Sequence, residues 1–544
     1  MRGKNISTAY RVALLFLLFY NIPHNGKSLE NMVFNTDKPD LVVGIVVDKM
    51  RYDYITRMWD SFSDNGFKKL ITEGTSFNNA RYDYLVNQSS AGYATIFSGA
   101  NPSAHGIIAD SWFDRLRNEN QSSVFDENSY AIGGSFGNGR KSPVRMFTGT
   151  VGDELRMSND FRSRVYSISM NDAAAVLSGG FSANTAWWFD DINGEWMTST
   201  YYVTNMPAWA QEFNEAKLPA TYLDRKWDPL LDFSAYFSIN GDRNQPFEYD
   251  LKRMQRRQVG YGNIRFTPFG NTFTRDFAIS LIVNEQLGKN GNTDMLIIGF
   301  SSTAAIGQHY GTFSMELQDA YLRLDQDIAY FLEFLEDRFG NSKVLVFLTS
   351  DQAVAYPAAA ANPSTRTAGG TFSPSMAISL LRSYLNVSYG QADWIHSYNA
   401  GMVYLNHSLI EASNVPLEDI QRKSSRFLNQ VSGIAGTVTE DVMLRNHFSD
   451  GILARVQAGF HPKRSGDIMM YLQQGWNERS LAGDQISLIS YDQHVPLVFY
   501  GWNTDRNSFN RMVNITDIVP TLSMMLNIPV PQFSTGRPIM ELLK

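Results

Sequence analysis

The stretch DLVVGIVVDKM, residues 40–50, is a continuous apolar run rich in β-branched residues, and it ends in an acid, Asp48. An uninterrupted run of this kind predicts a strand buried on both faces, as in a parallel sheet covered by helices. Four later stretches have the same form: SRVYSISM (163–170), DMLIIGF (294–300), SKVLVFLTSDQ (342–352) and HVPLVFYG (494–501). Because α/β enzymes place their chemistry at strand ends, Asp48 is a candidate site residue.

Amphipathic helical segments separate these strands. The clearest, residues 313–339, places apolar side chains at helical spacing with acids and bases between them. Alternating strands and helices predict an α/β fold with helices on both faces of the sheet. Two stretches interrupt the alternation, at about 181–275, which is rich in Trp, Tyr, Asn and Gly, and at about 386–483. We expect both to be insertions that cap the sheet.

The composition narrows the classes of function. A chain of 544 residues that is 43% hydrophobic can bury a large core. A net charge of −7 with mixed signs argues against a nucleic-acid partner. The sequence contains no cysteine, which excludes disulfides, a cysteine nucleophile, thiolate metal sites and a lipidated N-terminal cysteine.

Residues 1–28 have the features of a secretory signal peptide. Positive charges precede the apolar run VALLFLLFYNI at 12–22, which has the length of a signal-peptide core and is too short to span a bilayer. Cleavage near 26–28 would release the mature chain, and a membrane-tethered N-terminus is the alternative. No later segment has transmembrane length. We therefore expect an exported protein, in the periplasm or associated with the outer membrane of a Gram-negative bacterium.

A series of motifs, taken in order, resembles the alkaline phosphatase superfamily. The motifs are VVDKMRYDY (46–54), SGANPSAHGIIADSWFD (98–114), VGDELR (151–156), FLTSDQ (347–352), YDQHVPLVFYG (491–501), NITDIVPTLSMMLNIPVP (514–531) and TGRPI (535–539). The chain looks most like the PafA-type bacterial phosphatases, relatives of the type I phosphodiesterases and nucleotide pyrophosphatases. This resemblance implies one alkaline-phosphatase-like domain over residues 29–544, with a mixed, mostly parallel sheet, helices on both faces and capping insertions.

The same resemblance implies hydrolysis of phosphate esters by two zinc ions and a Thr or Ser nucleophile. Two metals can stabilise both the attacking and the leaving oxygen, and carboxylates and imidazoles bind zinc where no thiolate is present. The nucleophile position falls on Ser89, with Ser90 one residue away, although a serine there is equally an ordinary helix N-cap. Of the expected metal ligands, the chain keeps Asp48 and Asp351.

The other ligand positions carry side chains that bind zinc poorly or not at all. In GFSSTAAIGQHYG (299–311), which we expect to be a loop, the resemblance places Ala304 and Gln308 where the family has an aspartate and a histidine. Gln352 and Gln485 fall on two further histidine positions. His309 follows Gln308 directly, and a shift of one residue turns a side chain away from the site.

The phosphate-binding positions are changed as well. The resemblance places Asp110 at an asparagine of the family, and Asn171 and Ala173 at a lysine and an arginine. These changes remove the positive charge that stabilises a transferring phosphoryl group. We therefore interpret the chain as a non-catalytic binding or scaffold protein of the cell envelope that needs no cofactor.

Two other functions stay open at this point. The first is an active phosphomonoesterase or phosphodiesterase with Ser89 as nucleophile and at most one weakly bound metal, held by Asp48, Asp351 and His309. The second is a serine hydrolase that pairs Ser89 with His105 or with His494, the latter being a structural position in the resembled family.

The aromatic residues of the first insertion raise the question of a partner. They are Trp187, Trp188, Trp196, Tyr201, Tyr202 and Trp209. Such side chains could bind a glycan or an envelope protein. The alternative, which we prefer, is that they form a small core within the insertion.

Overall fold

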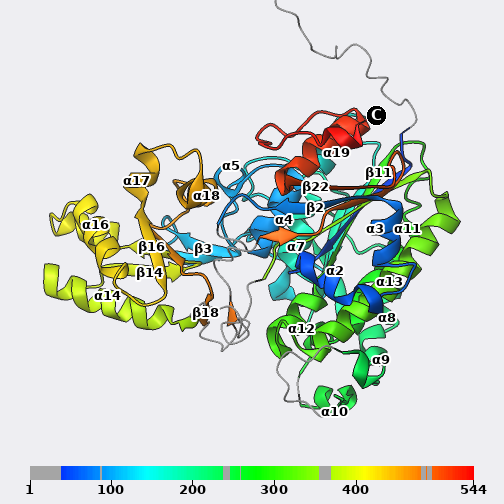
Figure 1. Ribbon diagram of the computed structural model, residues 1–544, viewed down its shortest axis with the longest axis horizontal. Coiled ribbons are helices and arrows are strands. Elements are labelled where there is room, and N and C mark those ends of the chain that lie inside the picture. Colours follow the sequence, from blue (N-terminus) through cyan, green and yellow to red (C-terminus); the bar gives the residue numbers. More distant parts are fainter. Residues whose placement is uncertain are drawn as a thin grey trace, which may run out of the picture. The chain divides into compact units, whose positions relative to one another are not determined.

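Five buried parallel strands form the centre of an 11-stranded sheet in the computed structural model (Figure 1). In spatial order they are β12 (Val344–Thr349), β1 (Leu41–Val47), β11 (Asp294–Phe300), β6 (Val165–Ser169) and β7 (Thr185–Asp190). Antiparallel strands flank them, β21 (Val498–Gly501) next to β12 and β8 (Glu195–Ser199) next to β7. The predicted mixed, mostly parallel sheet is therefore confirmed.

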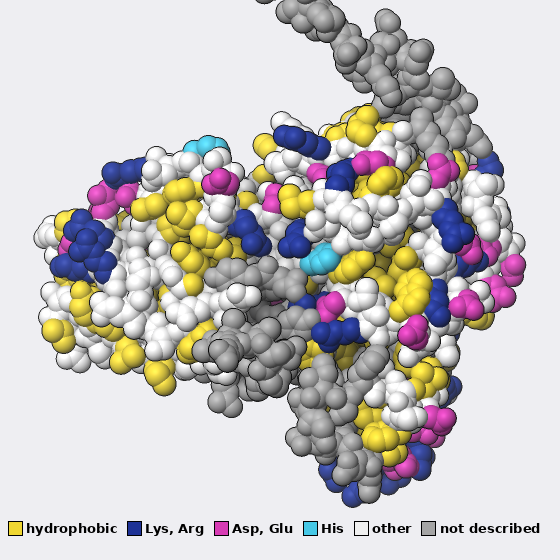
Figure 2. Space-filling model, in the orientation of Figure 1, with side chains coloured by type: hydrophobic (Ala, Val, Ile, Leu, Met, Phe, Trp, Pro, Cys, Tyr) yellow, Lys and Arg dark blue, Asp and Glu magenta, His cyan; other side chains and the backbone are white. Residues whose placement is uncertain are grey.

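The structure describes residues 38–543 apart from 86–87, 237–245, 258, 355–368, 480–484 and 487–492. The expected signal segment, residues 1–28, lies outside this part of the chain. Among the described helices, none combines the length and the apolar character needed to cross a bilayer. On the face shown in Figure 2, positively and negatively charged side chains are interspersed.

The strand that opens the sequence motif is apolar throughout because both of its faces are covered. Val42 and Val46 pack into the core on one face of the sheet, and Val43, Ile45 and Val47 pack into the core on the other. All five side chains are fully buried. An alternating pattern would leave one face polar, so the continuous run is what a doubly covered parallel strand requires.

Helices cover each face of the sheet (Figure 1). The first core contains residues of α4 (Ser89–Ser98), α6 (Val151–Met157), α7 (Asp172–Gly179) and α19 (Ile518–Leu526). The second core contains residues of α2 (Tyr52–Met58), α3 (Phe67–Glu73), α11 (Phe269–Asn284) and α13 (Met315–Phe339). The long amphipathic segment predicted at 313–339 is thus helical over nearly its whole length.

The two expected insertions differ in structure. In the first, 181–275, strands β7 and β8 extend the central sheet rather than only capping it, and α8 (Ala208–Glu215) follows them. The aromatic side chains of these strands are the reason, because Trp187 and Trp196 pack against Phe277 of α11 at ring-centroid distances of 5.4 and 4.7 Å. Burial of this much aromatic surface draws the segment into the main core.

The second insertion has a sheet of its own, which we call the accessory subdomain (residues 386–479). Its four antiparallel strands run in the order β14 (Ile395–Asn399), β15 (Met402–Leu405), β17 (Ile468–Leu472) and β16 (Ile434–Thr439). The helices that join them are α15 (His407–Ala412), α16 (Leu417–Leu428), α17 (Glu440–Arg445) and α18 (Gly451–Gly459). Figure 1 shows these elements in yellow and orange.

Helix α4 lies unusually close to the end of strand β12. A Cβ atom placed on Gly92 would lie 1.9 Å from the backbone oxygen of Asp351. Only glycine fits this approach, so Gly92 determines how near the start of α4 comes to the strand ends.

We predict that Gly92→Ala lowers the free energy of unfolding by about 1–3 kcal/mol, the usual cost of overpacking. In an open helix the same change would add about 1 kcal/mol of stability, so the sign of the effect reports the clash. Chemical denaturation measures it. Gly137→Ala is the control, because no atom lies within 4 Å of a Cβ at Gly137. A Gly92→Ala protein as stable as wild type would contradict the observed packing.

Candidate functional site

A polar cavity of about 440 Å³ lies where the carboxyl ends of β1, β6 and β11 meet the first turns of α4, α7 and α12. The structure brings together here most of the residues that the resemblance singled out. Those lining the cavity are Asp48, Ser89, Asp110, Asn171, Ala304 and Gln308. Asp351 and Gln352 are hydrogen-bonded to Ser89, and Ala173 is buried in the first turn of α7. The side chain of Gln485 lies outside the described residues.

The segment that follows β11 is a helix, α12 (Ser302–Tyr310), and the expectation of a loop there was wrong. Alanine and glutamine have high helix propensity, and the side chains of Thr303 and Ile306 are buried beneath the helix. Ala304 and Gln308 are four residues apart, so both lie on the helix face that lines the cavity.

Asp48 accepts a hydrogen bond from Tyr93, a residue of α4. The Tyr93 hydroxyl donates to Oδ1 of Asp48 at 2.6 Å, and both side chains are buried. Burial and the neighbouring Asp351 raise the pKa of Asp48 well above its usual value. Tyr93 lies one helical turn after Ser89 on α4, and sequence reasoning missed it because only the structure shows its hydroxyl beside the strand end.

Asp351 and Ser89 are also bonded to other protein groups. Oδ1 of Asp351 accepts from the backbone N–H of Lys49 at 2.7 Å. Burial raises the pKa of Asp351, and a hydrogen bond from the Ser89 hydroxyl opposes the rise. The Gln352 amide donates to Oγ of Ser89 at 3.2 Å. Ser89 therefore links Gln352 to Asp351, in a chain of hydrogen bonds beneath the cavity.

Asp110 lies at the N-terminus of α4, where a phosphate group would be favoured by the helix dipole. Its Oδ1 accepts from the backbone N–H of Ser90 at 2.9 Å, and its own N–H donates to the Gln88 side chain at 2.7 Å. The carboxylate thus occupies the anion-binding end of the helix with a negative charge that belongs to the chain.

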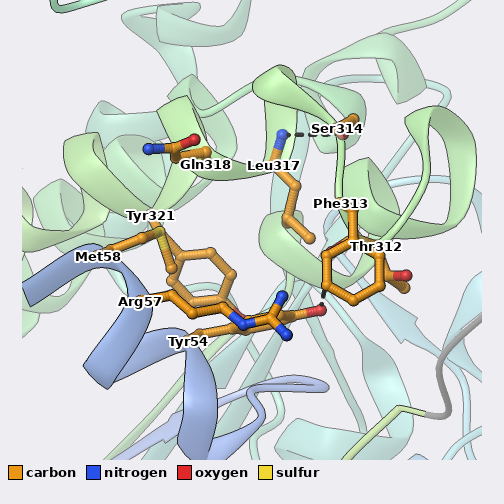
Figure 3. Close-up of a pocket in the computed structure, with 9 residues that line it drawn as sticks. All are labelled: Tyr54, Arg57, Met58, Thr312, Phe313, Ser314, Leu317, Gln318 and Tyr321. Atoms are coloured by element: carbon orange, nitrogen blue, oxygen red, sulfur yellow. Dashed lines mark hydrogen bonds between the residues drawn. The ribbon is translucent and has the colours of Figure 1, made fainter. Parts of the chain in front are cut away.

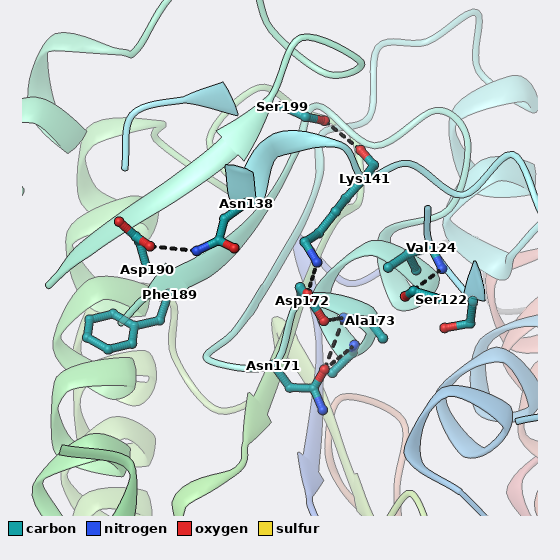
Figure 4. Close-up of polar contacts among 12 residues, drawn as sticks. Ser122, Val124, Asn138, Lys141, Asn171, Asp172, Ala173, Phe189, Asp190 and Ser199 are labelled. Atoms are coloured by element: carbon teal, nitrogen blue, oxygen red, sulfur yellow. Dashed lines mark hydrogen bonds and ion pairs between the residues drawn. The ribbon is translucent and has the colours of Figure 1, made fainter. Parts of the chain in front are cut away.

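The side chain of Asn171 caps the N-terminus of α7 (Figure 4). The carboxamide oxygen of Asn171 accepts from the backbone N–H groups of Ala173 and Ala174 at 3.0 and 3.3 Å. Beside it, Asp172 forms an ion pair with Lys141. Burial tends to raise the pKa of Asp172, but the Lys141 ammonium outweighs it and holds that pKa below its usual value. The polar side chains at the N-terminus of α7 are therefore already hydrogen-bonded or ion-paired within the chain.

The guanidinium of Arg265, a second cation of the cavity, is also paired with an acid. Nε of Arg265 lies 2.6 Å from Oδ1 of Asp191, and both residues line the cavity. Lys49 lies close enough to favour the charged forms of Asp48 and Asp351. The positive charges are thus opposed by acids of the chain itself.

His309 faces an aromatic surface. Its ring lies 5.3 Å from that of Phe266 and 4.6 Å from that of Tyr310, measured between centroids. These contacts direct the imidazole away from Ala304 and Gln308, which line the cavity from the same helix.

His105 and His494 have structural contacts of their own. His105 is fully buried, with Nε2 3.1 Å from Thr95 Oγ1 and Nδ1 accepting from the backbone N–H of Ile107. Burial lowers the pKa of His105 to about 3, so the ring is neutral. Nε2 of His494 lies 2.7 Å from the backbone oxygen of Asn78. In each of these hydrogen bonds the histidine contacts a group other than Ser89.

The residues present do not fit the two zinc ions that the resemblance implies. Ala304 has no ligand atom, and Gln308 and Gln352 offer neutral amides where zinc prefers imidazole or carboxylate. Asp48 and Asp351 are the remaining carboxylates at these positions. Two protein ligands are too few for two zinc ions, because each ion needs about three. We therefore derive no metal-dependent step for this cavity.

The aromatic residues of the first insertion belong to the main core. Trp187, Trp188 and Trp196 are at most 1% exposed. Trp209 donates its ring N–H to Glu285 at 2.7 Å. Tyr202 packs against the first core, beside Tyr201. The three buried tryptophans therefore offer little surface to a glycan ring, whereas Tyr201, Tyr202 and Trp209 are partly exposed.

A second cavity, of about 200 Å³, lies between α2 and the start of α13 (Figure 3). Its lining is mainly apolar and includes Tyr54, Met58, Phe313, Leu317 and Tyr321. No acid or histidine lines it, so the polar cavity is the better candidate for a functional site.

Comparison with known protein families gives one match that spans most of the chain. The model of the family "Type I phosphodiesterase / nucleotide pyrophosphatase" matches residues 42–485. The range includes the polar cavity and the accessory subdomain.

Curated relatives and a solved structure are similar over nearly their whole length. A "Calcium-transporting ATPase" of Myroides odoratus is 34% identical, over 93% of this chain and 95% of its own. Alkaline phosphatase PhoV of Synechococcus elongatus is 32% identical, over 98% of both chains. Alkaline phosphatase PafA of Elizabethkingia meningoseptica is 32% identical over 93% of this chain and 95% of its own. A PafA crystal structure matches with a TM-score of 0.87, at 31% identity, over 94% of this chain and all of that chain.

The raised pKa of Asp48 makes stability depend on pH. In the unfolded chain the carboxyl titrates at its ordinary pKa, whereas in the folded chain it keeps its proton to higher pH. Its contribution to stability is therefore full below the ordinary pKa and is lost as the pH rises toward the folded value. The loss has a limit of about 1.4 kcal/mol for each pH unit in that window.

We predict that Asp48→Asn melts at a higher temperature than wild type at pH 8 and at a similar temperature near pH 4. Asparagine keeps an oxygen that accepts from Tyr93 and removes the cost of a buried charge. Differential scanning calorimetry at the two pH values measures the effect. Asp64→Asn, at a side chain that is 93% exposed, is the control and should show no such difference. A lower melting temperature for Asp48→Asn at pH 8 would indicate a metal ligand.

Proposed function

Because the chain belongs to the type I phosphodiesterase / nucleotide pyrophosphatase family, within the alkaline phosphatase superfamily, we propose that it is a non-catalytic member. In this proposal the protein is exported and acts as a binding or scaffold protein of the cell envelope, with a glycan or another envelope protein as partner. The observation that carries the proposal is that Ala304 and Gln308 line the cavity beside Asp48, at positions where the resemblance places metal ligands.

Loss of metal binding is supported by side-chain chemistry. A binuclear site offsets its acids with the charge of two divalent ions, and acids packed together without metal would raise one another's pKa. Here burial and the neighbouring Asp351 raise the pKa of Asp48 and favour a neutral carboxyl, which is stable without metal, while the bond from Tyr93 opposes that rise. Ala304 and Gln308 add no further negative charge to the cavity.

Loss of phosphate binding is supported by electrostatics. A phosphate at the N-terminus of α4 would meet the Asp110 carboxylate, which already bonds to the Ser90 N–H. The nearby cations Lys141 and Arg265 are paired with Asp172 and Asp191. Phosphoryl transfer needs donors aimed at developing negative charge, and these groups are directed at the chain's own acids.

A solved variant of PafA allows the same positions to be compared. That variant, similar with a TM-score of 0.87, has serine for a threonine and alanine for an asparagine, a lysine and an arginine. Its threonine and asparagine are 21 residues apart and its lysine and arginine two apart, the separations of Ser89 from Asp110 and of Asn171 from Ala173. Two of its replacements, serine and alanine, are the residues that this chain carries.

One observation favours the alternative of an active phosphomonoesterase or phosphodiesterase. Ser89 is at the cavity surface and is hydrogen-bonded to Asp351, so a hydroxyl and a carboxylate remain together at the nucleophile position. An activity assay separates the two proposals.

We predict that the purified protein hydrolyses p-nitrophenyl phosphate and bis-p-nitrophenyl phosphate no faster than its Ser89→Ala variant, with or without added zinc. The reason is that Lys141 and Arg265 are paired with acids of the chain and that the Asp110 carboxylate would repel a phosphate. Ser103→Ala, at an exposed serine, is the control for handling and folding. A wild-type rate about tenfold above that of Ser89→Ala would establish the active enzyme instead.

We also predict that zinc binding can be restored. The combination Ala304→Asp, Gln308→His, Gln352→His and Gln485→His should bind more zinc per chain than wild type by elemental analysis, because each half-site needs about three protein ligands. Gln308→His alone should bind no additional zinc. Adding Asp110→Asn, Asn171→Lys and Ala173→Arg should then raise phosphate-ester hydrolysis. A quadruple variant that folds normally and gains no zinc would contradict the assignment of these positions.

A further inference from the structure

Three metal-ligating side chains meet at one edge of the accessory subdomain. His407 begins α15 shortly after β15, Glu440 begins α17 directly after β16, and Asp467 directly precedes β17. Strands β15 and β16 both run antiparallel to β17, and Ile468 of β17 pairs with one residue of each. The topology therefore brings residues 33 and 27 positions apart to the same edge of the sheet.

The geometry of this cluster suits one small cation. Ligand atoms of His407, Glu440 and Asp467 all lie within 4.8 Å of one another, and Nε2 of His407 is 2.6 Å from Oδ1 of Asp467. The Asp467 side chain is fully buried, whereas that of His407 is 41% exposed. The cluster thus has a rigid inner end and an outer end that solvent can reach.

We propose that His407, Glu440 and Asp467 bind one divalent cation of the borderline class, with zinc as its representative. An imidazole with two carboxylates is a ligand set that zinc accepts, and the imidazole disfavours calcium and magnesium, which prefer oxygen ligands. The site is separate from the polar cavity, and the inference does not depend on whether that cavity is active.

The surrounding hydrogen bonds orient the carboxylate toward the site. Oδ2 of Asp467 accepts from the backbone N–H of Leu405 at 2.8 Å and from Arg115 at 3.2 Å, which leaves Oδ1 directed at His407. Gln421 donates to that same Oδ1 at 3.2 Å. Hydrogen bonds that hold a carboxylate in this way orient it as a metal ligand and maintain its basicity.

The charges of the cluster match a divalent ion. The carboxylates of Glu440 and Asp467 lie within 4.8 Å of each other, so a cation between them would offset their repulsion. Arg115 offsets only part of this charge. The proton of the His407–Asp467 pair would leave to solvent when Nε2 binds the metal, so zinc should bind more weakly as the pH falls.

The test uses the full-length protein, stripped with EDTA, dialysed and titrated with zinc chloride by isothermal titration calorimetry and thermal melting. We expect one zinc ion per chain and a rise in melting temperature, because the ligand binds only the folded form. Glu440→Gln and His407→Ala should each weaken zinc binding by about tenfold or more. His447→Ala, which removes an exposed histidine of the same subdomain, should bind zinc as wild type does.

The opposite results would overturn the proposal. They are no zinc uptake by the wild-type chain, or uptake that Glu440→Gln and His407→Ala leave unchanged. If Asp48→Asn removes the zinc instead, the metal lies in the polar cavity, and the proposed loss of activity is then also in doubt. Circular dichroism checks that each variant folds. If His407→Ala does not fold, the effect of Glu440→Gln on zinc binding decides the test.

Discussion

The hydrogen bond from Tyr93 to Asp48 is the constraint around which the strand ends are arranged. Two acids, Asp48 and Asp351, are fully or nearly fully buried there, and burial of charged carboxyls without partners is costly. Tyr93 reaches Asp48 because Gly299 has no side chain, since a Cβ there would lie 2.4 Å from the tyrosine hydroxyl. One helix, α4, thereby supplies hydrogen-bond partners for both buried acids, Tyr93 for Asp48 and Ser89 for Asp351.

Other polar groups of the cavity are also bonded to groups of the chain itself. Asp110 bonds to the start of α4, Asn171 caps α7, and Lys141 pairs with Asp172. These polar groups therefore already have partners within the chain. These internal pairs leave fewer groups at the cavity for an external ion or a phosphate.

The sequence predicted the framework of the fold well. The five apolar stretches became adjacent strands of the central sheet, because a strand buried on both faces can hardly be polar. Local pattern failed at α12, where small residues after a strand resembled a loop, and in β7 and β8, whose aromatic residues join the main core. In both cases tertiary packing decided the outcome.

The sequence predicted which residues line the candidate site, but it did not predict the hydrogen bonds between them. Order and spacing of motifs identified Asp48, Ser89, Ala304 and Gln308, which line one cavity. Nothing in the sequence marked Tyr93 as the partner of Asp48. His407, Glu440 and Asp467 lie in a segment where no motif suggested a site, and only the pairing of β15, β16 and β17 brings them together.

The Asp110 carboxylate has a consequence for any ligand of this cavity. Attached to the chain and held 2.9 Å from the first turn of α4, it acts as an intramolecular competitor for that helix end. A tethered group of this kind has an effective concentration of roughly millimolar or higher. A free anion of similar affinity would therefore reach this helix end only at a comparable or higher concentration.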